Sequence, residues 1–429
     1  MKTIGMVCTL LTLGTLQTWA DSTVVASQQT SQPQKTLPPD TAYTVIERGA
    51  NHRVWEKTSY EPGQNGVATP RKHRYTELAT GMHYLKNGQW VEAKEVIEPY
   101  PTGAIARQGQ YQVIFANNLK TAAAIDQQTP EGKRIRSNIL GLEYYDTSTG
   151  KSALIAEVQD SQGQLVAANQ VLYPEAFQGL KADVQYTYKR GSFEQDVILR
   201  EQPPAPETYG LNSATTVLEV LTEFINPPKD QTLVHRQKRG TDTDVRWGKM
   251  GIGRGKAFDL SDKRKAHTRI QVTKEYFKAQ GRQFLLEEVP LVSVKSSLST
   301  LPQHAGLKAK TPATASSTRV IPAPLLAQAT TQPMKLASVA PSPQGFVLDY
   351  VEFNSDQGDT TFQAAPPTSS LATSIWWVIP YLKAARSSNT GMMTAIPPSP
   401  SIGARLPARL DHTGRPFSPR AMMTRWGKI

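Results

Sequence analysis

Cysteine is nearly absent from this chain. Cys8 is the one cysteine among 429 residues, and it lies in an N-terminal segment that we predict to be removed. A mature chain without thiols cannot form disulfides, zinc–thiolate sites or a cysteine nucleophile. Its stability must therefore come from a hydrophobic core.

Long apolar runs are lacking as well. The run from Ile4 to Leu16 follows Lys2 and precedes Thr18-Trp19-Ala20, a series of charged, apolar and small residues that is typical of a secretory signal. The run is too short to cross a bilayer. We predict that residues 1–20 are a signal peptide, that the protein is secreted to the extracellular space, cell surface or periplasm, and that no transmembrane segment remains after cleavage.

Motifs of catalysis and of cofactor binding are missing too. The chain contains no Gly-x-Ser-x-Gly and no His-Glu-x-x-His, and its seven histidines are scattered. The segment Gly251–Ala257 resembles a phosphate-binding loop, but Met250 and Ala257 occupy the positions that need a glycine and a hydroxyl. We therefore predict no catalytic residue, no cofactor and no metal site, and we favour a protein that is not an enzyme.

The positive charge is concentrated in one part of the chain. Residues 1–228 carry 20 basic and 23 acidic side chains, whereas residues 229–282 carry 15 and 6, within a formal net charge of +12. Four aspartates interrupt the basic cluster, and no row of aromatic residues accompanies it, as binding of single-stranded nucleic acid would require. We expect no nucleic-acid partner, and we favour a solvated surface over a site for an acidic polysaccharide.

Short runs of β-branched and aromatic residues, separated by turn residues, extend from Tyr43 to Pro228. No long apolar stripe of helical period lies between them, so the pattern predicts an all-β fold with an antiparallel, sandwich-like body. A second predicted hairpin turns at Arg190-Gly191. About 190 residues are enough to enclose a sizeable core.

The clearest single element is the segment 83–92. Asn87-Gly88 suits the positive φ angles of a two-residue type I′ turn, so the segment is predicted to form a β-hairpin. In this register Leu85 lies opposite Trp90, and Tyr84 lies opposite Val91.

Composition divides the remainder of the chain. We predict a disordered leader at residues 21–40, a main β domain at 41–228 and a basic β appendage of the same body at 229–290. A linker rich in Ala, Pro, Ser and Thr is predicted at 291–344, an isolated strand at 345–362 and a disordered tail at 363–429.

Two kinds of side chain are candidates for ligand binding. Exposed aromatic residues on strands can hold sugar rings, and clustered cations can neutralise an acidic polymer. The alternatives are that the aromatic residues belong to the core and that the cations form a solvated surface. The candidates are Trp55, Tyr84, Trp90, Arg254, Lys256, Lys263, Arg264 and Lys265.

The segments 47–61, 75–98 and 182–204, together with the YDTSTGK sequence at 145–151, resemble a known group of proteins. They are similar to the N-terminal region of large uncharacterised secreted bacterial proteins that continue into β-helical or RHS/YD-like repeats. The likeness covers residues 43–362 and implies no specific activity. Because the chain departs from that pattern near residue 363, we hypothesise that the tail is an out-of-frame or degenerate sequence.

These observations predict a secreted, non-catalytic β module for surface attachment, presentation or assembly, with an extracellular glycan or cell-surface polymer as its partner. The alternative is an extracellular carbohydrate-binding or glycoside-hydrolysing protein. A hydrolase would need two carboxyl groups roughly 5–10 Å apart in a groove lined by Trp or Tyr.

Overall fold

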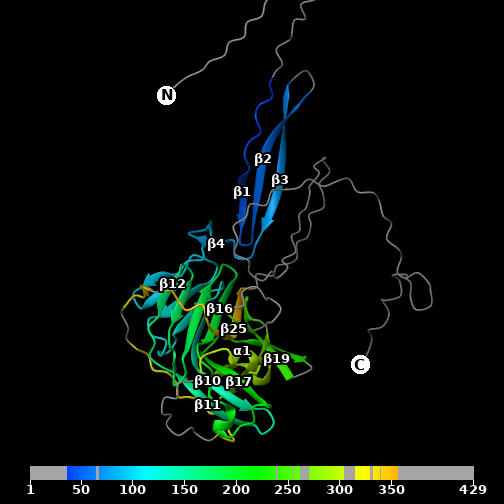
Figure 1. Cartoon of the computed structure of the whole chain (residues 1–429). Coiled ribbons are helices and arrows are strands. Elements are labelled where there is room, and N and C mark those ends of the chain that lie inside the picture. The colour runs from blue at the N-terminus through cyan, green and yellow to red at the C-terminus, as the bar shows by residue number, and fades with distance from the viewer. Residues whose placement is uncertain are drawn as a thin grey trace, which may run out of the picture. The chain divides into compact units, whose positions relative to one another are not determined.

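The computed structural model describes residues 36–355, except 64–66, 238–239, 254, 261–269, 304–314, 329–331 and 339. The predicted signal peptide, most of the leader and the tail lie outside the described residues. Strands dominate the described part of the chain (Figure 1), which confirms the predicted all-β class. No helix in this part is both long and apolar enough to cross a membrane.

The first three strands form an antiparallel sheet of their own, composed of β1 (Thr44–Gly49), β2 (His52–Pro62) and β3 (Ala68–Leu78). Its register places Arg53 opposite Glu77 and Trp55 opposite Tyr75. Most side chains on both faces are exposed or half-buried. Since neither face covers a hydrophobic core, pairs of side chains on neighbouring strands must hold this sheet together.

Strands β4 (His83–Lys86) and β5 (Gln89–Glu92) form the predicted hairpin. Asn87 and Gly88 have φ angles of 53° and 76°, as a type I′ turn requires. Leu85 lies opposite Trp90 and Tyr84 opposite Val91, so the predicted register is confirmed.

The remaining strands build two larger sheets. The first sheet contains β6 (Glu98–Tyr100), β7 (Gly103–Ala106), β8 (Gln112–Ala116), β9 (Ile125–Gln128), β10 (Arg134–Asp146), β11 (Lys151–Val158), β14 (Phe177–Gln178), β17 (Thr216–Ile225), β22 (Ile270–Ala279) and β23 (Arg282–Pro290).

The second sheet contains β12 (Gln164–Ala167), β13 (Gln170–Tyr173), β15 (Ala182–Tyr188), β16 (Ser192–Leu199), β18 (Gln231–Gln237), β19 (Gly240–Trp247), β20 (Met250–Ile252), β24 (Lys335–Leu336) and β25 (Phe346–Ser355). Strand β21 (Gly255–Asp259) pairs with both β25 and β22 and so joins the two sheets into a closed network. Among the described strands, only β12 and β24 pair in parallel.

The main core draws side chains from both sheets. Tyr111, Tyr144, Tyr186 and Tyr188 are buried in it. Phe193 stacks on Tyr186 at a centroid distance of 5.5 Å. The large buried rings and the two sheets fit the predicted sandwich-like body.

Two C-terminal segments differ from their predicted form. The segment 291–344 was predicted to be a linker. It begins instead with the helix α1 (Leu291–Leu298), which directly follows β23 and buries Leu291, Val294 and Leu298. The chain also contains one 3₁₀ turn, η2 (Pro206–Tyr209), within its described residues. The strand predicted at 345–362 is β25, which pairs with β16, β20 and β21 and is therefore not isolated. Both segments gain their structure from partners that lie far away in the sequence.

Candidate functional site

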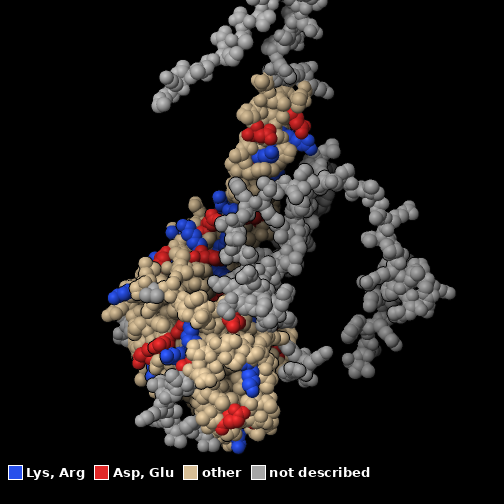
Figure 2. Space-filling model, in the orientation of Figure 1, with Lys and Arg blue, Asp and Glu red and all other residues tan. Residues whose placement is uncertain are grey.

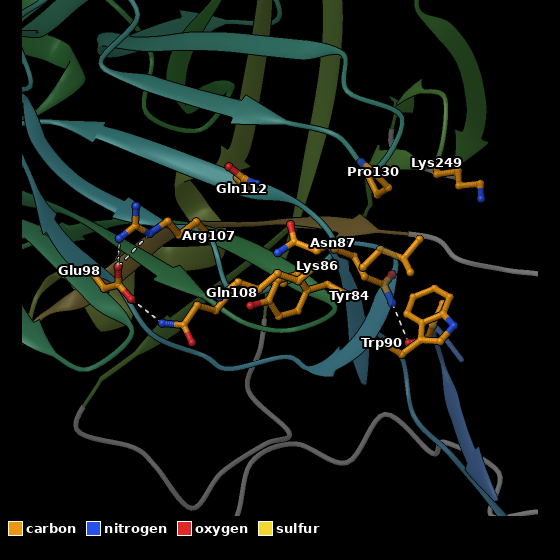
Figure 3. Close-up of a pocket in the computed structure, with 14 residues that line it drawn as sticks. Tyr84, Lys86, Asn87, Trp90, Glu98, Arg107, Gln108, Gln112, Pro130 and Lys249 are labelled. Carbon is orange, nitrogen blue, oxygen red and sulfur yellow. Dashed lines mark hydrogen bonds and ion pairs between the residues drawn. The ribbon is translucent and has the colours of Figure 1, made fainter. Parts of the chain in front are cut away.

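An open groove of about 880 Å³ lies beside the β4–β5 hairpin (Figure 3). The hairpin supplies one part of the lining. Strand β6, residues 107–110 between β7 and β8, strand β8, and the loops that carry Ala50, Pro130 and Lys249 supply the rest. The groove is lined by Ala50, Tyr84, Leu85, Lys86, Asn87, Trp90, Glu98, Arg107, Gln108, Gly109, Gln110, Gln112, Pro130 and Lys249. Its volume is in the range typical of small-molecule sites.

Both faces of the hairpin contribute aromatic or apolar groups to the groove. Tyr84 is half-buried and lies near its middle, next to Gln108, whereas Trp90 lies at one side (Figure 3). The Trp90 side chain is 36% exposed, and its cross-strand partner Leu85 is exposed as well. The tight Asn87-Gly88 turn presents these side chains without a core beneath them, so their apolar surface is available to a ligand.

The groove lining contains a single carboxylate among the described residues. Glu98 accepts a hydrogen bond of 3.0 Å from Arg107 Nε and a short one from Gln108 Nε2. Arg107 also forms an ion pair of 2.8 Å with the same carboxylate. This acid is therefore neutralised, and it has no second carboxylate in the groove with which to divide the roles of acid and nucleophile.

Cations outnumber acids along the lining. Arg107 is paired with Glu98, but Lys86 and Lys249 have no ion-pair partner within the part of the chain that the structure describes. Lys249 is brought to the groove by its backbone N–H, which donates to Glu131 Oε1 at 3.1 Å. The lining consequently carries three cations and one carboxylate, a charge balance that favours an anionic ligand.

The loop at the floor of the groove is tied to the hairpin. Gln110 Nε2 donates to the carbonyl oxygens of Ala50 at 2.7 Å and His83 at 3.0 Å. Gly109 precedes it, and a Cβ atom at this position would collide with the Tyr188 hydroxyl. These contacts make the floor a fixed surface that is shaped before any ligand binds.

Trp55, the third aromatic candidate, lies on β2 in the three-stranded sheet and does not line the groove. Its Nε1 donates to Glu77 at 2.9 Å, its ring stacks on Tyr75 at 6.1 Å, and the Arg53 guanidinium lies 4.9 Å from the ring centroid. Arg53 also approaches Glu92 of β5 within 3.7 Å. One face of the Trp55 ring is thus already covered, whereas Trp90 remains accessible.

Lys256 is the one basic candidate among the described residues, and it does not line the groove. Lys256 lies half-buried on β21, where it pairs with Gln271 of β22. Arg254, Lys263, Arg264 and Lys265 lie outside the described residues. On the face shown in Figure 2, Lys and Arg side chains are interspersed with Asp and Glu.

A second group of carboxylates lies on the face of the first sheet opposite the main core. Glu143 of β10, Glu219 of β17 and Glu288 of β23 are successive cross-strand partners, so their side chains share one face. Burial raises the pKa of Glu143, raises that of Glu219 well above its usual value, and raises that of Glu288 to about 7. Two neighbouring carboxyl groups can act as the acid and the nucleophile of a glycoside hydrolase, provided that a substrate can reach them.

Residues 315–328, which we call the strap, cover this glutamate row. Arg319 lies 3.4 Å from Glu143, forms a closer ion pair with Glu219, and places its guanidinium over the Tyr145 ring. Ile321 packs on an adjacent apolar cluster formed by Leu140, Leu221, Phe284 and Leu286. Glu143 and Glu219 are fully buried beneath the strap, and Glu288 is half-buried, so two of the three carboxyl groups are closed to a substrate.

Reasoning from the sequence found Tyr84 and Trp90 but missed the polar part of the groove. Lys86 directly precedes the predicted Asn87-Gly88 turn and could have been included. Glu98 and Arg107 meet across nine residues of sequence, whereas Lys249 reaches the lining from a distant part of the chain. Comparison of the chain with protein-family models, with curated proteins and with solved structures finds no match. The function must therefore be inferred from the site.

Proposed function

We propose that this protein is a secreted, non-catalytic β module that attaches to an acidic extracellular polysaccharide through the β4–β5 groove. The proposal depends on one observation. The aromatic rings of Tyr84 and Trp90 line the same groove as Lys86 and Lys249, which have no ion-pair partner among the described residues, and the one carboxylate of the lining is paired with Arg107. Secretion itself comes from the predicted signal peptide.

The chemistry of the groove suits this class of ligand. Aromatic faces pack against the apolar faces of sugar rings, and side-chain amides such as Asn87 and Gln112 can bond to hydroxyl groups. Ammonium groups attract carboxylate or sulfate substituents. Hydrolysis is not favoured because the groove lining offers no second carboxylate, and because the strap covers Glu143 and Glu219 in the glutamate row.

Retention of the full chain on immobilised polygalacturonate, compared with neutral dextran across a salt series, tests the proposal. We expect salt-sensitive retention on the acidic polymer, weakened about tenfold by Trp90→Ala if the ring contributes about 1.4 kcal/mol. The double variant Lys86→Gln/Lys249→Gln should abolish the preference for the acidic polymer.

Val292→Ala is a matched control, since Val292 is an exposed apolar residue on α1, outside the groove. This variant should bind as the wild type does. Trp90→Ala should also unfold at the same urea concentration as the wild type, because Trp90 is not part of the core. Undiminished retention of Trp90→Ala, or no retention of the wild type on either polymer, would contradict the proposal.

A further inference from the structure

A lysine and an aspartate are buried in contact between strands β22 and β19. Lys274 Nζ lies 2.7 Å from Asp242 Oδ1, and the backbone N–H of Lys274 donates to the same oxygen at 3.1 Å. The two side chains are 0% and 2% exposed. An amine that lies this close to one carboxyl oxygen is also within reach of the carbon to which that oxygen is bonded.

A second acid lies next to this pair. Glu287 of β23 is the direct cross-strand partner of Lys274, so the two side chains point to the same face of the sheet. Glu287 is buried, and Tyr276, which shares this face of β22, packs against the main core. Lysine, aspartate and glutamate are thus held together in a place from which water is largely excluded.

Burial distinguishes this lysine from the others that form ion pairs. Among ion pairs between described residues, four more involve lysine, and in each the lysine side chain is at least a quarter exposed. A desolvated lysine is the form that acts as a nucleophile, whereas an exposed ammonium stays protonated and hydrated. A buried ion pair by itself adds little stability, because the loss of hydration of the two charges offsets most of their attraction.

We propose that Lys274 and Asp242 become joined by an intramolecular amide bond, formed by the protein itself with Glu287 as the proton carrier. A proton passes from the ammonium to the aspartate, and the neutral Nζ then attacks the protonated carboxyl carbon Cγ. Glu287 accepts the second proton from Nζ and returns it to the departing hydroxyl group. The N–C bond forms, a C–O bond breaks and one water leaves, so the step needs no oxidant and no cofactor.

The bond would supply a covalent cross-link that the thiol-free mature chain cannot obtain from cysteine. It would close a loop between positions 242 and 274 and so fix β19 to β22, two strands that belong to different sheets. Such a link stabilises the fold by restricting the unfolded chain.

Mass spectrometry of a tryptic digest of the full chain tests the proposal. Trypsin does not cleave after an acylated lysine, so the wild type should yield peptides 240–246 and 270–278 as one linked species, lighter than their sum by one water. Lys278, four residues further along β22, provides an internal control. It pairs with Asp230 at 3.6 Å and is 61% exposed, so cleavage after it should proceed.

Glu287→Gln keeps the size of the side chain but removes the proton carrier. This variant, once its circular dichroism shows a folded protein, should yield peptide 240–246 unlinked, and cleavage after Lys274 should give peptides 270–274 and 275–278. A linked species in Glu287→Gln would overturn the role assigned to Glu287. Separate peptides from the wild type would overturn the bond itself and leave a buried ion pair.

Discussion

The three-stranded sheet β1–β3 and the two larger sheets are stabilised in opposite ways. The small sheet has no core and depends on cross-strand contacts at its surface, such as Arg53 with Glu77 and Trp55 with Tyr75. The larger sheets enclose rings such as Phe115 and even bury charged groups. Each exposed pair contributes less than about 1 kcal/mol to the free energy of unfolding, whereas a large buried side chain contributes about 3–5 kcal/mol. A substitution at the surface of the small sheet should therefore cost little stability, and a substitution between the larger sheets should cost much more.

The largest effect should come from a core ring. Phe115→Ala removes a fully buried side chain that lies 5.9 Å from Phe193 and 6.1 Å from Tyr186 between ring centroids. We expect a loss of about 4 kcal/mol in the free energy of unfolding. Urea denaturation followed by circular dichroism measures it, with the exposed Leu336→Ala as control. A loss below about 1 kcal/mol would contradict the two-sheet core.

The strap should come next. Arg319→Ala leaves Glu143 and Glu219 buried without their counter-ion, at a cost of about 3 kcal/mol near neutral pH. The loss should shrink as the pH falls, because protonated glutamates need no cation. Unfolding in urea at pH 5 and at pH 8 tests this. An equal loss at both values would mean that packing of the strap, rather than its charge, is what matters.

Glu288 should oppose stability at high pH. Burial raises its pKa to about 7, so between about pH 4 and pH 7 the folded state binds a proton that the unfolded state does not. Stability contributed by this proton is present below that range and is lost as the pH rises through it. Glu288→Gln should therefore be more stable than the wild type at pH 8, by roughly 1–2 kcal/mol. A variant that is no more stable at pH 8 would refute the direction of the shift.

The smallest effect should be confined to the three-stranded sheet. Trp55→Ala removes the stacking on Tyr75 and the hydrogen bond to Glu77, at a cost of about 1 kcal/mol. Hydrogen exchange should quicken in β2 and β3 but not in β10 or β17. Faster exchange in both regions would show that the three-stranded sheet and the larger sheets unfold together, so that the small sheet is not stabilised separately.

Elements that depend on contacts between residues close in the sequence could be predicted, and elements that depend on distant contacts could not. The hairpin at 83–92 was predicted with its register because Asn87-Gly88 dictates the turn on its own. The strap was not, because its composition is that of a linker, and Arg319 finds Glu143 at a separation of 176 residues. Likewise, Lys274 and Asp242 belong to a stretch read as solvated charge, and only strand pairing shows that they are buried.

The position of β25 has a consequence for how the protein is made. This strand lies between β16 on one side and β20 and β21 on the other, yet it is the last strand in the described chain. During synthesis, β16 leaves the ribosome with one edge open, and about 150 further residues must be made before its partner β25 is available. Assembly of the second sheet is therefore a late event, and the open edge of β16 is exposed to aggregation until residue 355 has been made.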